Sequence, residues 1–75
     1  MIAAYNEVNY IQNETISTTK IVTGSSVLAG YDVTNAKPVG EVVVTSGGNL
    51  VIQANSDVIF TRDVEVQQGG VLEIR

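Results

Sequence analysis

Hydrophobic and polar residues alternate in short runs through the second half of the chain, the pattern of half-buried β-strands. The runs predict strands near 36–39, 41–45, 49–53, 58–61, 63–67 and 71–75. Within them, every second residue should face a common interior: Val42, Val44, Leu50, Ile52, Val58, Phe60, Val64, Val66, Leu72 and Ile74. The residues between them should point outward, among them Thr45, Val51, Ile59, Glu65 and Glu73. No helical spacing of apolar residues competes with this pattern.

The chain also resembles itself at an interval of 22 residues. Val22, Val44 and Val66 fall into one column of this repeat, and Leu28, Leu50 and Leu72 fall into another. Lys20 then shares an inward column with Val42 and Val64. Small residues separate the columns at 24–26, 46–48 and 68–70, and Gly48 and Gly70 are expected to supply the positive φ of sharp corners.

A fixed period of this length is typical of stacked repeats. The sequence therefore predicts an all-β fold, a short parallel β-helix or solenoid-like stack of three coils of about 22 residues. The stack should span 10–75, with 1–9 as an N-terminal cap or linker. The alternative is an antiparallel sandwich or small barrel, in which the Gly-Gly pairs would be hairpin turns. Hairpins explain the turns but not the matching residues 22 positions apart.

Composition narrows the class of protein. Hydrophobic residues make up 44% of the 75 and charged residues 16%, which argues against intrinsic disorder. Cysteine is absent, which excludes disulfides and thiolate metal sites. A net charge of -4 makes nucleic acid and anionic membrane surfaces poor partners. No apolar run is long enough for membrane insertion. Few charges and many polar uncharged residues favour an extracellular or cell-surface protein.

The second half of the chain resembles a known type of module. The stretches Gly47 to Phe60 and Val64 to Ile74 carry the resemblance, with Ala54-Asn55-Ser56 as a middle turn and Val64-Glu65-Val66 as a late strand. They are similar to the three-coil β-stack modules, called coathanger stacks, of secreted Bacteroidetes proteins. The resemblance covers about residues 10–75, although Thr61-Arg62-Asp63 departs from the Pro-Gly-Phe usual in the family. It implies a parallel β-helical spacer in a larger exported protein, and it implies no catalytic residue.

Side chains suited to catalysis or metal binding are few. Histidine is absent, so no Ser–His or Cys–His system can be built. Calcium could use oxygen ligands from two columns, Asp57 with Asn35 and Asp63 with Glu41, but polar corner residues more often bond their own backbone. Glu65 and Glu73 are the candidate pair for glycoside hydrolysis, on different strands without a predicted groove. We predict no catalytic, cofactor-binding or metal-ligating residue and no cofactor.

Two functions remain after this search. The first is a non-catalytic structural or spacer module of a larger exported bacterial protein. Its partners would be neighbouring domains and, through weak self-association of the last coil (58–74), a second copy. The alternative is a carbohydrate- or surface-binding module, for which exposed rings on a flat sheet are the candidate contacts: Tyr5, Tyr10 and Tyr31. Asn13-Glu14-Thr15 also matches the short N-glycosylation pattern.

Overall fold

A computed structural model describes residues 7–75 as two β-sheets, without a helix in that range. The first sheet has the order β1-β3-β5-β7, and the second has the order β2-β4-β6. Their bounds are β1 Val8–Ile11, β2 Glu14–Ile16, β3 Thr19–Ala29, β4 Val42–Val44, β5 Asn49–Phe60, β6 Val64–Val66 and β7 Val71–Ile74. Every pairing between these strands is parallel. Because hairpins produce antiparallel pairs, the sandwich or barrel alternative is wrong.

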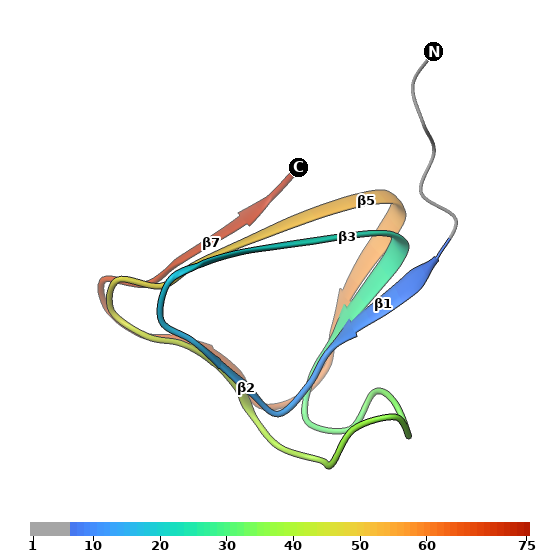
Figure 1. Ribbon diagram of the computed structural model, residues 1–75, viewed down its shortest axis with the longest axis horizontal. Helices are drawn as coiled ribbons and strands as arrows, with labels where there is room; N and C mark the ends of the chain where they lie inside the picture. Colours follow the sequence, from blue (N-terminus) through green and yellow to red (C-terminus); the bar gives the residue numbers. More distant parts are fainter. Residues whose placement is uncertain (1–6) are drawn as a thin grey trace.

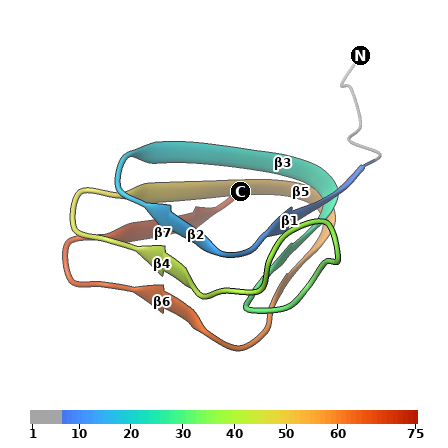
Figure 2. The ribbon, with the colours of Figure 1, turned by 60° about the horizontal axis from the view of Figure 1, so that its bottom comes forward.

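The chain passes alternately between the two sheets and encloses a three-sided interior (Figure 1). β3 and β5 are long strands that bend around one corner, so each contributes to two sides. The first part of β5 pairs with β7, and the second part of β3 pairs with β1. Seen from the side, the strands of each sheet lie one above the other (Figure 2).

The predicted spacing of 22 residues is correct for the later strands. Val44 pairs with Val66 between β4 and β6. Leu50 pairs with Leu72, and Ile52 with Ile74, between β5 and β7. Here the side chains are also chemically alike, so the sequence repeat and the hydrogen-bond register coincide. The long parallel sheet explains why residues 22 apart match in identity as well as polarity.

The same spacing is wrong for the first third of the chain. Val22 pairs with Ile52 and not with Val44, and Lys20 pairs with Leu50 and not with the Val42 column. Leu28 lies between Tyr10 and Ile59, outside the Leu50–Leu72 column. The cause is the long connection 30–41 between β3 and β4, where only 61–63 connect β5 to β6. This connection contains 36–39, which form no strand.

The corners are made differently from the prediction. The positive φ angles belong to Gly47 (86°) and Gly69 (87°), not to Gly48 and Gly70. Gly48 is needed for another reason, because a Cβ there would lie 2.2 Å from the carbonyl oxygen of Ile16. At 24–26 there is no separate turn, and β3 continues through the corner with a shift of register between Gly24 and Ser26.

The core contains eight buried aliphatic side chains from both sheets: Ile11, Ile16, Val27, Ala29, Val42, Val44, Leu50 and Ile52. Phe60, predicted to be core, pairs with buried Ala29 but is 37% exposed. Val51, predicted to face outward, lies outside this cluster and is still only 3% exposed. Ile21 and Glu73 flank it on the neighbouring strands, which explains its burial.

Two further predictions concern the N-terminal boundary of the fold and membrane insertion. β1 begins at Val8, so the sheet includes Val8 and Asn9, which the predicted boundary at residue 10 left out. Residues 1–6, most of the predicted cap or linker, lie outside the described residues. Among residues 7–75, no helix is both long and apolar enough to span a membrane.

Candidate functional site

The two ends of the stack differ in chemistry, and this difference is the main feature of the molecule. Six inward residues of the middle strands are completely buried: Val27, Ala29, Val42, Val44, Leu50 and Ile52. The strand register places one neighbour of each toward the N-terminal side and one toward the C-terminal side. We call these two sets of six residues the first end face and the last end face.

The first end face is half polar. Its members are Asn9, Ile11, Glu14, Ile16, Lys20 and Val22. The last end face has no polar member and consists of Val58, Phe60, Val64, Val66, Leu72 and Ile74. The inward columns therefore run from a mixed polar surface, through a fully buried aliphatic centre, to an entirely apolar surface.

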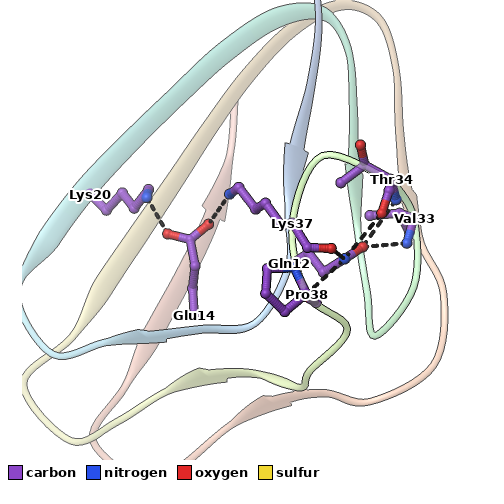
Figure 3. A network of polar contacts seen from close by, with 7 residues as sticks. All are labelled: Gln12, Glu14, Lys20, Val33, Thr34, Lys37 and Pro38. Atoms are coloured by element: carbon purple, nitrogen blue, oxygen red, sulfur yellow. Dashed lines mark hydrogen bonds and ion pairs between the residues drawn. The ribbon is translucent and has the colours of Figure 1, made fainter.

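Glu14 is the centre of an ion cluster on the first end face (Figure 3). Its Oε1 atom accepts a hydrogen bond from Lys20 Nζ, and its Oε2 lies 3.1 Å from Lys37 Nζ. Burial by itself raises the pKa of Glu14, but the hydrogen bonds and positive charges of the two lysines outweigh burial and lower it below its ordinary value. Glu14 is therefore ionised at neutral pH, and its charge is balanced within the face.

Gln12 joins the long connection 30–41 to the first sheet. Its side chain is fully buried, and both of its polar atoms are satisfied by backbone (Figure 3). Nε2 donates to the carbonyl oxygens of Thr34, Lys37 and Pro38 at 3.2, 3.0 and 3.1 Å. Oε1 accepts from the N–H groups of Val33 and Thr34 at 2.5 and 3.0 Å. The connection forms no strand, so its backbone groups lack strand partners. The side-chain amide of Gln12 supplies hydrogen-bond partners to several of them.

The last end face is partly open to solvent. Ile74 is 52% exposed, Val66 is 40% exposed and Phe60 is 37% exposed. Val58, Val64 and Leu72 are half-buried and pack against the core. Within residues 7–75, β6 and β7 are the outermost strands of their sheets on this side. Each therefore has a row of backbone N–H and C=O groups without a strand partner, a feature that recruits further strands.

The tyrosines predicted as sugar contacts have different surroundings. Tyr10 is 37% exposed and lies in a row with Leu28 and Ile59 across β1, β3 and β5. Tyr31 is half-buried, and the guanidinium carbon of Arg62 lies 4.3 Å from the centroid of its ring. That cation–π contact occupies one face of the ring. Tyr5 lies outside the described residues.

The two aspartates considered as calcium ligands, Asp57 and Asp63, lie on a strand and at a corner. Asp57 pairs with Ser26 rather than Asn35, and it accepts a hydrogen bond from the Ser26 hydroxyl. Asp63 precedes β6 with φ of 63°, as Asn13 precedes β2 with φ of 54°, a conformation that Asp and Asn tolerate better than other side chains. No group of three or more acidic residues suited to a metal ion occurs in the described part of the chain.

Glu65 and Glu73 lie in different sheets, on β6 and β7. Glu65 is exposed, while Glu73 forms an ion pair with Arg75, with its Oε2 2.5 Å from Arg75 Nε. Glu73 thus has a partner two residues further along the chain.

Sequence reasoning missed Gln12 and the ion cluster of Glu14, Lys20 and Lys37. Lys20 at an inward position was the available signal, because a charged residue in an apolar column requires a partner. The partners could not be identified, since Lys37 reaches Glu14 from a connection that the repeat had assigned to a strand.

Comparisons of the chain with protein-family models, with curated proteins and with solved structures find no match.

Proposed function

We propose that this chain is a non-catalytic structural module, a short parallel β-helical stack of three coils that spaces or joins parts of a larger exported bacterial protein. The three sets of inward residues support this proposal, because each set comes from one passage of the chain around the enclosed interior. The similarity of residues 10–75 to the coathanger stacks of secreted Bacteroidetes proteins supports the same conclusion, as does the cysteine-free composition.

One observation carries the proposal: the last end face is entirely apolar, and its outer strands have no further strand beside them within residues 7–75. Such a surface is suited to continuation of the stack by a neighbouring domain or by another chain. Two polar residues, one directly after β1 and one on the first end face, are in contrast used within the fold. Gln12 orders the connection 30–41, and Glu14 pairs with two lysines.

A spacer must keep a constant length, and this can be measured. Donor and acceptor fluorophores on small domains fused to the two ends of the chain should give one narrow distribution of single-molecule energy transfer. Leu50→Asp, which places a charge at a fully buried position, serves as the unfolded control and should broaden the distribution. A broad distribution for the unaltered chain would contradict the proposed role.

The second candidate function is a carbohydrate- or surface-binding module at an extracellular location. The exposed ring of Tyr10, in a row with half-buried Leu28 and exposed Ile59, favours it, because a ring on a flat sheet can stack on a sugar. A glycan array separates the two functions. Saturable binding that is lost in Tyr10→Ala would support the binding module, and absence of binding across the array would support the spacer.

A further inference from the structure

The last end face could contact a partner in two ways, through exposed apolar side chains and through backbone hydrogen bonds. Its six inward side chains are all apolar, and Ile74, Val66 and Phe60 are 52%, 40% and 37% exposed. Within residues 7–75, its edge strands also have backbone N–H and C=O groups that no other strand pairs with, and these groups point in a defined direction. The N–H of Val71 in β7 donates to the carbonyl oxygen of Gly48, just before β5, and the N–H of Arg75, just after β7, donates to that of Ile52. Since directions alternate along a strand, the N–H and C=O groups of Leu72 and Ile74 point to the open edge.

The first end face is a poor complement to this surface. At its inward positions lie Asn9, Glu14 and Lys20, and Lys37 pairs with Glu14 across it. An apolar face placed on them would take the ion pairs out of water without supplying new partners. Head-to-tail stacking of copies is therefore disfavoured, and with it the open filament that a head-to-tail contact generates.

We propose that a second copy of this chain docks on the last end face through its own last end face, forming a closed two-fold dimer. The inference rests on the proposed function, because it treats this face as the joining surface of the module. A two-fold axis perpendicular to β7 makes this strand antiparallel to β7 of the partner subunit, and antiparallel edges pair directly. Leu72 and Ile74 supply the backbone groups for that ladder, and the six apolar side chains supply the buried surface.

The size of the face sets the strength of the dimer. The stack is 15 Å deep along its shortest axis and 37 × 26 Å across, with a three-sided outline (Figure 1). A face that fits within this outline is small for a specific interface. The contact is therefore weak and reversible, and it forms at high protein concentration.

Sedimentation equilibrium of the unaltered chain from 10 µM to 1 mM tests the proposal. The expected result is a monomer–dimer equilibrium that ends at twice the 8.0 kDa mass of the chain. Ile74→Lys should raise the dissociation constant at least tenfold. Ile21→Lys is the matched control, because Ile21 is 59% exposed but lies on β3, away from the last end face, and it should leave dimerisation unchanged. If Ile74→Lys fails to fold, Val66→Lys on β6 takes its place.

Three results would overturn the dimer. They are a strict monomer at 1 mM, growth beyond the dimer, and equal loss of association in Ile74→Lys and Ile21→Lys. A strict monomer that keeps a narrow energy-transfer distribution would reject the dimer alone and leave the spacer standing. A dimer that binds glycans through Tyr10 would reject the spacer and leave the dimer standing.

Discussion

Lys20 lies directly beside Leu50 in the register of β3 and β5, and the other strand neighbour of Leu50 is Leu72. Leu50 is completely buried, while the Lys20 side chain is 41% exposed and its amino group pairs with Glu14. The aliphatic part of Lys20 thus extends the column and its charge ends the column. This relationship marks where the apolar interior stops on the N-terminal side.

Replacement of Glu14 by Gln should destabilise the fold modestly. Two ion pairs are lost, but both lysines are 40–41% exposed, so solvent screening limits their contribution to about 1 kcal/mol. Urea denaturation at pH 7 measures the free energy of unfolding. Glu65→Gln is the control, since Glu65 is exposed on β6 and should change stability little.

Stability should depend on pH through the same residue. Because the lysines lower the folded-state pKa of Glu14, its ionised form contributes stability above the unfolded value near 4.5. That contribution is lost as the pH falls from this value through the lower folded-state pKa. Melting temperatures measured from pH 7 to pH 3 should therefore fall less steeply for Glu14→Gln than for the unaltered chain. Parallel pH profiles for the two proteins would contradict the assignment.

Replacement of Gln12 by Ala should cost roughly 2–4 kcal/mol, because it leaves several backbone groups of 30–41 without their buried partner. The effect should also be local. Hydrogen exchange at the amides of Val33 and Thr34 should accelerate strongly, while exchange at Val44 in β4 should follow only the global change. Uniform acceleration at all three amides would show that Gln12 does not act on the connection specifically.

Replacement of Leu50 by Ala should cost roughly 2–5 kcal/mol, since it opens a cavity between Lys20 and Leu72 at the centre of the core. Leu72→Ala should cost less, about 1–2 kcal/mol, because Leu72 is half-buried on the last end face and water can fill the space. Thermal unfolding of both variants gives the comparison. A larger effect at Leu72 would mean that the last end face is covered in solution.

Adjacent glycines in one turn should respond differently to Ala. At Gly47, where φ is 86° and the nearest atom to a new Cβ is 3.9 Å away, the cost is backbone strain of about 1–2 kcal/mol. At Gly48 a new Cβ would lie 2.2 Å from the Ile16 carbonyl oxygen, so β2 and the turn must separate and the loss should be larger. Gly47→Asn should recover part of the stability, and Gly48→Asn should not.

The sequence by itself determined the alternation and the register of the strands in the later half of the chain, from β4 onward. Val44 with Val66 and Leu50 with Leu72 could be predicted because equal spacing there leaves equal side chains in contact. The local pattern of residues is sufficient to predict the strand register where one passage of the chain around the interior has the same spacing as the previous one. It also identified the last end face as apolar, since all six of its residues had been assigned inward positions.

Only the tertiary structure decided the first third of the chain and the exposure of the end residues. The connection 30–41 changes the spacing between β3 and β5, and the Gln12 hydrogen bonds that order it join residues 21 to 26 positions apart. Such contacts leave no periodic signal in the sequence. The burial of Phe60 and Val51 could not be predicted from the sequence either. Exposure of these side chains depends on whether a strand lies alongside them and not on their hydrophobicity. Inward direction is a local property of a strand, whereas burial requires neighbours that the fold alone supplies.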